Sequence, residues 1–173
     1  MIVITGAAGF IGSCLISKLN DEGYVDLVLV DDFSKAEKRI NWEGKKFFQT
    51  IDRNNFIEWA KENANQIQFI YHIGARTDTA EFDIDLLNRL NLEFSKQVWN
   101  LCVAEGLPLV YASSAATYGL GEIGFKDDQA TMPNLKPLNP YGQSKQDFDV
   151  WALAQEKKPY FWVGLKFFNV PSR

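Results

Sequence analysis

The feature that most constrains this chain is a glycine-rich segment placed directly after its first apolar run. Residues 2–5 read IVIT, and residues 4–12 read ITGAAGFIG, which spaces Gly6, Gly9 and Gly12 three residues apart. A β-branched run followed by an amphipathic stretch predicts a strand-to-helix turn. In such a turn Gly6 permits the tight bend, Gly9 lets a pyrophosphate approach the backbone, and Gly12 lets the helix pack closely on the sheet. The segment therefore predicts a dinucleotide-binding turn whose helix N-terminus faces the phosphates.

Apolar runs and helical patterns alternate along the rest of the chain. Continuous apolar runs occupy residues 2–5, 26–31, 68–74, 108–113 and 161–168, and helical spacing occupies 10–19, 56–62, 86–104 and 141–154. Continuous apolar character suits strands that are covered on both faces. This order predicts an α/β fold, a Rossmann-type doubly wound parallel sheet in one domain (1–173), with residues 119–140 as a long loop. Ligands of such sheets bind at the carboxyl ends of the strands.

The residues after the second predicted strand bear on which cofactor would bind. Asp31 ends this strand about twenty residues beyond the glycines, where a carboxylate accepts hydrogen bonds from an adenosine ribose and repels a 2′-phosphate. That reading favours NAD. Lys35, Lys38 and Arg39 follow closely and are suited to clamp the 2′-phosphate of NADP. The residues alone leave both cofactors open.

A tyrosine and a lysine stand four positions apart in NPYGQSK, residues 139–145. Pro140 suits the first position of a helix, so Tyr141 and Lys145 share one face in its first turns. Holding a phenol with a pKa near 10 as phenolate at pH 7 takes roughly 4 kcal/mol. Lys145 and an oxidised nicotinamide ring would supply this stabilisation. Tyr141 is then predicted to act as a general base during hydride transfer, with Lys145 bonded to the nicotinamide ribose.

A serine-rich strand end precedes this helix. Residues 111–119 read YASSAATYG, and the hydroxyls of this segment should emerge at the carboxyl edge of the sheet. Ser114 is placed to donate a hydrogen bond to the reacting oxygen. Ser114, Tyr141 and Lys145 are the catalytic residues that the sequence predicts.

Five segments, TGAAGFIGS, HIGARTDT, YASSAATYG, KPLNPYGQSK and GLKFFNV, carry a family resemblance. They resemble the extended, sugar-nucleotide-modifying branch of the short-chain dehydrogenase/reductases, and within it the ADP-L-glycero-D-manno-heptose 6-epimerases. The resemblance covers essentially the whole chain. It implies interconversion of ADP-D-glycero- and ADP-L-glycero-D-manno-heptose, a step toward the lipopolysaccharide core, through transient oxidation of C6″ to a ketone. It also favours NADP over NAD, against the plain reading of Asp31.

The resemblance assigns roles to individual positions. Catalysis falls to Ser114, Tyr141 and Lys145, and substrate contact to Ser114 and Asn169. Cofactor contacts, beside the three glycines and Lys145, fall to Phe10, Ile11, Asp31, Asp32, Lys38, Arg53, Ile73, Gly74, Ala75, Arg76, Thr77, Asn91 and Val170.

The C-terminal end departs from the family pattern. Members continue well past the FNV strand end into a substrate domain that carries a second catalytic base, whereas here only PSR follows. We therefore expect the C-terminal substrate domain to be missing and this chain to be inactive alone. Two alternatives stay open. One is another epimerase or a dehydratase that acts on UDP- or dTDP-sugars, and Ala115 and Ala116 argue against the dehydratase. The other is a non-catalytic nucleotide-binding module.

Composition excludes several other classes. The formal charge is -4 with scattered basic residues, so nucleic acid is not an expected partner. No apolar run is long enough to cross a bilayer and no signal peptide is evident, which gives a cytoplasmic expectation. The sequence contains no cluster of cysteine or histidine residues, so a metal site is not predicted. Cys14 and Cys102 are expected to be buried without a disulfide, and His72 to be buried and hydrogen-bonded. The sequence leaves a homo-oligomer open.

Overall fold

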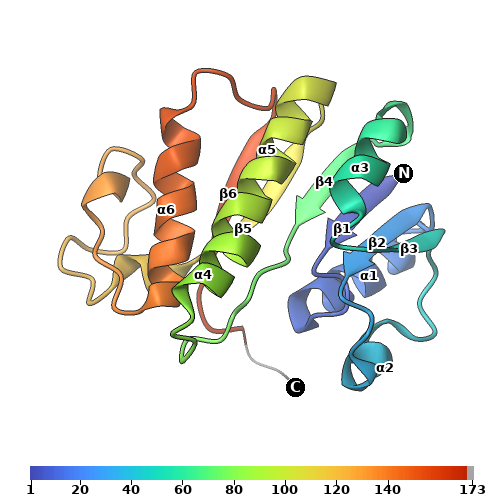
Figure 1. Cartoon of the computed structure of the whole chain (residues 1–173), viewed down its shortest axis with the longest axis horizontal. Helices are drawn as coiled ribbons and strands as arrows, with labels where there is room; N and C mark the ends of the chain where they lie inside the picture. Colours follow the sequence, from blue (N-terminus) through green and yellow to red (C-terminus); the bar gives the residue numbers. More distant parts are fainter. Residues whose placement is uncertain (171–173) are drawn as a thin grey trace.

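The computed structural model describes residues 1–170, and its centre is a six-stranded sheet in which every neighbouring pair is parallel (Figure 1). The strand order is β3-β2-β1-β4-β5-β6, the order of a doubly wound nucleotide-binding fold. This confirms the predicted α/β fold class. The strands are β1 (Ile2–Thr5), β2 (Leu27–Asp31), β3 (Gln49–Asp52), β4 (Phe69–His72), β5 (Leu109–Ser114) and β6 (Trp162–Phe167).

One strand was not predicted, and the ends of others shifted. β3 lies at an edge of the sheet and reads QTID, with alternating half-buried and exposed residues rather than a continuous apolar run. It pairs with β2 from Val28↔Gln49 to Asp31↔Asp52. An edge strand of this polarity does not stand out in the sequence. The run at 68–74 forms only four strand residues, because the chain leaves the sheet after His72.

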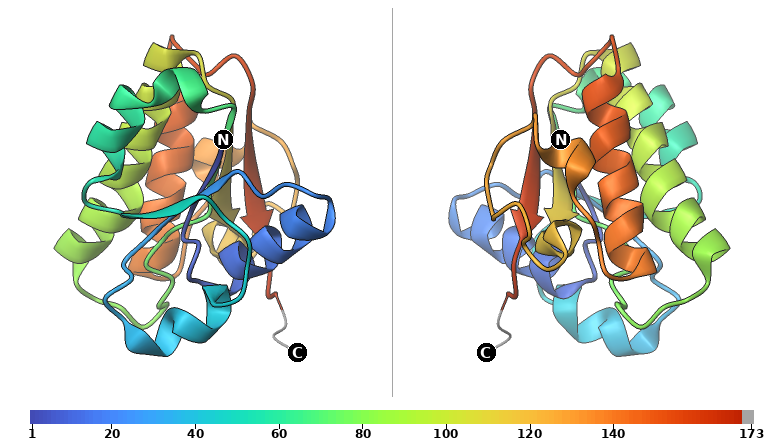
Figure 2. Two further views of the ribbon diagram at one scale, coloured as in Figure 1. Left: turned by 90° about the vertical axis from the view of Figure 1, so that its right-hand side faces the viewer. Right: turned by 90° about the vertical axis from the view of Figure 1, so that its left-hand side faces the viewer.

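Helices cover the two faces of the sheet unequally. α1 (Phe10–Asp21) lies on one face, with the short α2 (Arg39–Trp42) beside it, whereas α3 (Phe56–Glu62), α5 (Phe94–Glu105) and α6 (Pro140–Ala154) lie side by side on the other (Figures 1 and 2). The short helix η5 (Met132–Asn134) interrupts the predicted loop at 119–140.

The predicted helix at 86–104 consists of three segments. These are α4 (Ile84–Leu87), the π-helical turn η3 (Asn88–Glu93) and α5. Asp83 caps the first of them by accepting a hydrogen bond from the N–H of Leu86 at 2.9 Å. α5 ends at Gly106, whose φ of 64° is left-handed. π-helical turns are frequently associated with functional sites.

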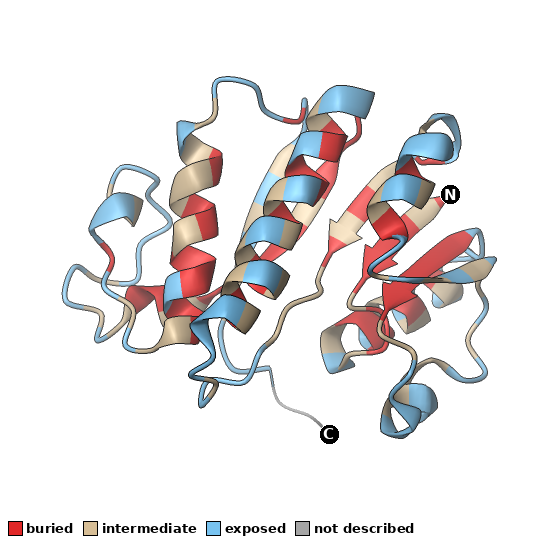
Figure 3. Cartoon of the chain, in the orientation of Figure 1, coloured by how far each residue is buried: buried red, intermediate tan, exposed pale blue. Residues whose placement is uncertain are grey.

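Two apolar cores follow from this layering. The larger lies between the sheet and α3, α5 and α6, and includes the fully buried Trp99, Phe56 and Phe148. The smaller lies under α1 and includes Ile4, Ile16 and Leu29. In Figure 3 the buried residues of the helices face the sheet and the exposed ones face away. Val3 and Ile4 fall in different cores, which agrees with strands covered on both faces.

The α1 side of β5 and β6 carries apolar side chains that no helix of the described chain covers. Val163 pairs with Val110 in the register, and Leu165 pairs with Ala112. Val163 is 37% exposed and Leu165 is 39% exposed. Parallel sheets are ordinarily covered on both faces, so this half-face, centred on Val163 and Leu165, is unusual for the fold.

The cysteines and the single histidine can now be placed. The expectation that both cysteines are buried is wrong for Cys14, which is exposed on α1, and is confirmed for Cys102; both are free thiols. His72 is buried as expected. Within residues 1–170 there is no cluster of potential metal ligands, and no helix long and apolar enough to span a membrane.

Candidate active site

Two adjoining cavities lie along the carboxyl edge of the strands. The first has a volume of about 290 Å³ and the second about 580 Å³. The glycine turn and the segment after β4 line both cavities, which are together called the crevice below. The shared residues are Phe10, Ile11, Ile73, Ala75 and Thr77. This is the position at which a doubly wound sheet binds its ligands.

The glycine turn is built as predicted. Gly6 has a φ of 69°, and a Cβ there would lie 2.5 Å from the Cα of Gly74, so side chains are excluded by both conformation and space. A Cβ on Gly12 would lie 2.2 Å from the carbonyl oxygen of Gly6. Gly9 is the N-cap of α1, and no side chain caps this helix. The first N–H groups of α1 are therefore available to an anion in the crevice.

Asp31 is held by the protein at the end of β2. One carboxylate oxygen accepts a hydrogen bond from the N–H of Ala8 at 2.9 Å, and the other accepts from the N–H of Asp32 at 2.8 Å and from Nζ of Lys38 at 3.1 Å. Three donors thus occupy most of the acceptor sites of this carboxylate. The prediction from sequence treated Asp31 as a free acceptor, whereas here it forms an ion pair with Lys38 at 3.1 Å.

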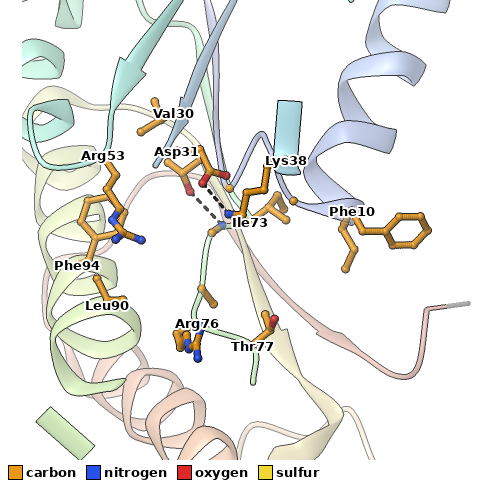
Figure 4. A pocket seen from close by; sticks show the side chains of 16 residues that line it. Phe10, Val30, Asp31, Lys38, Arg53, Ile73, Arg76, Thr77, Leu90 and Phe94 are labelled. Atoms are coloured by element: carbon orange, nitrogen blue, oxygen red, sulfur yellow. Dashed lines mark hydrogen bonds and ion pairs between the residues drawn. The ribbon is translucent and has the colours of Figure 1, made fainter. Parts of the chain in front are cut away.

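Basic residues gather around Asp31, where the end of β2 lines the smaller cavity. In Figure 4 the side chains of Lys38 and Arg53 flank Asp31. Arg53 lies 3.7 Å from Asp32, and its buried Nε has no hydrogen-bond partner in the described chain. Lys35 does not line the cavity, and Arg39 pairs with Glu43 at 3.1 Å on the surface. Of the three basic residues that the sequence suggested as a phosphate clamp, only Lys38 faces the crevice.

The segment after β4 forms the floor between the two cavities. The N–H of Gly74 donates to the Thr5 hydroxyl at 3.2 Å. The side chain of Asn91 holds the backbone of Arg76 on both sides, accepting from its N–H at 2.7 Å and donating to its carbonyl at 3.0 Å. Asn91 also donates to the Ser144 hydroxyl at 3.0 Å, which links this floor to α6.

The start of α6 positions Tyr141 at the larger cavity. Asn139 accepts a hydrogen bond from the N–H of Gly142 at 2.7 Å, and Pro140 occupies the first helical position. A Cβ on Gly142 would lie 2.9 Å from the carbonyl oxygen of Ala116, so the first turn of α6 packs directly on the chain that follows β5. This contact brings Tyr141 next to Ser114.

Burial and neighbouring groups set the pKa of Tyr141. Tyr141 is 9% exposed. Burial raises its pKa above the usual value, and the Ser114 hydroxyl, as a hydrogen-bond partner, works in the opposite direction. Lys145, which was expected to lower this pKa, is not among the groups that shift it here. The phenol is therefore protonated here at neutral pH.

Lys145 is among the most buried side chains of the protein, at 2% exposed, yet it lines the larger cavity. Burial lowers its pKa to about 8; Asp149 raises this pKa and Lys166 lowers it. Within residues 1–170 its ammonium has no hydrogen-bond partner. An ammonium that faces a cavity without a partner is suited to bind a ligand oxygen.

Most predicted site residues line the crevice, and three do not. Ser114, Tyr141, Lys145, Asn169 and Val170 all line the larger cavity. Gly12, Asp32 and Asn91 line neither cavity, although Asp32 lies 3.7 Å from Arg53 and Asn91 bonds the backbone of Arg76.

Other lining residues were not anticipated from the sequence. Leu90 and Phe94 line the smaller cavity, whereas Thr79, Phe167 and Phe168 line the larger. Their apolar or common residue types give no signal of a site.

Comparison with protein families gives a match over almost the whole chain. The matching model is described as the NAD dependent epimerase/dehydratase family and covers residues 2–173.

Curated relatives match the same span. The ADP-L-glycero-D-manno-heptose-6-epimerase of Fusobacterium nucleatum is 45% identical over 98% of this chain and 52% of its own length. That of Nitratidesulfovibrio vulgaris is 42% identical over 98% of this chain and 53% of its own length. The chain thus spans about half the length of the curated relatives it matches.

Solved structures give the same picture. The Helicobacter pylori ADP-L-glycero-D-manno-heptose-6-epimerase is 26% identical, with a TM-score of 0.74 over 97% of this chain and 55% of that one. MoeE5 in complex with UDP-glucuronic acid and NAD is 28% identical, with a TM-score of 0.74 over 96% of this chain and 54% of that one.

Proposed function

Because the chain belongs to the NAD dependent epimerase/dehydratase family, we propose that it is the cofactor-binding part of an ADP-L-glycero-D-manno-heptose 6-epimerase. The observation that carries the proposal is the crevice that joins the glycine turn to Ser114, Tyr141 and Lys145. Relatives of that name, 35% to 45% identical over 98% of the chain, support the choice of sugar. The chain spans about half of their length, so turnover is proposed for a protein of that length and cofactor binding for this chain.

The residues of the larger cavity have distinct roles in this proposal. When bound, a nicotinamide cofactor would supply reversible hydride transfer at C6″ of the heptose, away from one face of that carbon and back to the other. Tyr141 is protonated in this structure, so it would act as general base toward the C6″ hydroxyl only once Lys145 and a positively charged nicotinamide ring beside it lower its pKa, and a proton returns to that oxygen when the ketone is reduced. Ser114 donates a hydrogen bond to the same oxygen, and Lys145 bonds the ribose and supplies positive charge. Asn169, which also lines this cavity, would contact the substrate.

We propose NADP as the cofactor. The adenosine end of the crevice contains Lys38 and Arg53, and Asp31 is already bonded to three protein donors. A carboxylate paired with a lysine repels a 2′-phosphate far less than a free one does. The buried Nε of Arg53, unpartnered in the described chain, favours an additional acceptor there. These features support the 2′-phosphate of NADP.

A second candidate differs in both cofactor and sugar. MoeE5, with a similar fold and 28% identity, is complexed with NAD and UDP-glucuronic acid. This likeness favours an NAD-dependent enzyme that acts on a UDP-sugar. It is distinguished from the first candidate by cofactor preference and by the nucleotide of the substrate.

The proposal is tested in two steps. NADPH and NADH are titrated into the chain while the nicotinamide fluorescence is followed, and tighter binding of NADPH is expected. A protein that carries this chain and has the length of these relatives, called the full-length protein below, is then supplied with ADP-D-glycero-D-manno-heptose or with UDP-glucose, and the products are separated by chromatography. Epimerisation of the ADP-heptose alone supports the proposal. Turnover of the UDP-sugar contradicts the proposal, and so does a failure of both NADPH and NADH to bind the chain.

A further inference from the structure

A buried charged cluster lies beneath the larger cavity, between α6 and the last two strands. At its centre is Asp149 of α6, which is 1% exposed. Its carboxylate accepts hydrogen bonds from the hydroxyl of Tyr111 at 3.0 Å, the hydroxyl of Ser113 at 2.6 Å and Nζ of Lys166 at 2.7 Å. Tyr111 and Ser113 come from β5, and Lys166 from β6.

This cluster adjoins Lys145. Asp149 follows Lys145 by one helical turn, so the two side chains lie on the same face of α6. A buried ammonium is costly unless a negative charge is near it. The other groups around Lys145 supply none, since Tyr141, Tyr111 and His72 are neutral at neutral pH and Lys166 is a second cation. Among the groups named here, Asp149 alone brings a negative charge near Lys145.

We infer that Asp149 is the counter-charge of Lys145, shared with Lys166, and therefore a positioning residue for the cofactor-binding ammonium. Asp149 does not line the cavity and acts on the site through Lys145. By its bond to Ser113 it also anchors the strand end that carries Ser114. The inference rests on the proposed function only in the role given to Lys145.

The directions of the pKa shifts agree with the geometry. Burial lowers the pKa of Lys145 to about 8, Asp149 acts against this shift, and Lys166 adds to it. Removing Asp149 should therefore lower the pKa of Lys145, and removing Lys166 should raise it. A purely structural role for Asp149 does not give opposite signs.

The test measures the pKa of Lys145 by NMR in the chain labelled with ¹³C at the lysine Cε, with the signal assigned through Lys145→Arg. We expect Asp149→Asn to lower this pKa by about one unit or more, as the loss of a nearby opposite charge does. Lys166→Met should raise it, and Asp149→Glu should keep it near the wild-type value. Asp147→Asn is the matched control. Asp147 lies on the same helix, and its carboxylate accepts a hydrogen bond from the side-chain amide of Gln143 at 2.7 Å on the protein surface.

Folding of each variant is checked by circular dichroism, since Asp149→Asn leaves Lys166 without its carboxylate. Where Asp149→Asn does not fold, the double variant Asp149→Asn/Lys166→Met, which removes both charges of the ion pair, is compared with Lys166→Met alone, and a lower Lys145 pKa in the double variant is the expected result. A Lys145 pKa that is unchanged in the folded variants, whatever their melting temperatures, overturns the inference. Failure of the wild-type chain to bind NADPH contradicts the proposed function instead, and leaves the pKa measurement intact.

Discussion

The hydroxyl of Thr5 lies 2.7 Å from Nδ1 of His72, and this contact joins the ends of β1 and β4 beneath the glycine turn. On the other side of the ring, Nε2 lies 2.9 Å from the hydroxyl of Ser95, which donates its own proton to the carbonyl of Asn91. Nε2 must therefore carry the proton, and Nδ1 accepts from Thr5. The arrangement fits a neutral imidazole and has no place for a second proton.

Acid should destabilise the protein through His72. Burial lowers its pKa from 6.5 to about 3. Between these values the unfolded chain binds a proton that the folded chain does not, so the free energy of unfolding falls as the pH falls, by on the order of 4 kcal/mol. Urea denaturation at pH 7, 5 and 4 measures this loss. His72→Gln should show a weaker dependence on pH, and equal slopes for both proteins would contradict the assignment.

Two glycines of the turn should respond differently to alanine. Gly12→Ala places a Cβ 2.2 Å from the backbone oxygen of Gly6, so we expect destabilisation of about 2 kcal/mol or more. Gly9 has a φ of -82° and its nearest atom is 3.2 Å away, so Gly9→Ala should cost less stability and mainly weaken NADPH binding. Thermal melts and fluorescence titrations of both variants check this contrast. Equal loss of stability would count against it.

Lys38 should determine the preference for a 2′-phosphate. Lys38→Ala removes a cation from the adenosine end and leaves the Asp31 charge unpaired, so NADPH affinity should fall about tenfold or more. NADH affinity should change little. Lys35→Ala is the control, because Lys35 lies outside the cavity. A parallel loss of both cofactors in Lys38→Ala would indicate a structural role.

Tyr141 should be needed for turnover and not for cofactor binding. In the full-length protein we expect Tyr141→Phe to lower kcat for ADP-heptose epimerisation by about 10²- to 10⁴-fold, the range for loss of a general base. The ring still fills its site, so NADPH affinity should be retained. If cofactor affinity falls together with kcat, the role given to Tyr141 is incorrect.

The uncovered half-face should tolerate polar substitution. Leu165 is 39% exposed, so Leu165→Thr should change the free energy of unfolding by less than about 1 kcal/mol. Leu109 is fully buried, and Leu109→Ala should cost about 2 to 5 kcal/mol. Urea denaturation compares the two. A similar loss in both variants would mean that Leu165 is covered in solution, by self-association for example, which light scattering detects.

Most of the residues predicted for the site line the two cavities because they stand at strand ends and helix starts. A glycine turn, a strand-terminal Asp31 and a Pro140-Tyr141 helix start are local signals, and parallel strands bring them to one edge. β3 was missed because an edge strand with alternating polarity has no strong local pattern. The exposure of Cys14 was missed because residue type is a poor guide to which face of α1 it occupies.

The sequence by itself determined the fold class, the glycine turn and the place of Tyr141 and Lys145 one helical turn apart, because these depend on periodicity and on backbone conformations over a few residues. Only the tertiary structure decided which charges meet. It paired Asp31 with Lys38, turned Arg39 toward Glu43, and paired Asp149 with Lys166. The reason is physical: electrostatic energy depends on distance and burial, and both are fixed by contacts between segments far apart in the chain.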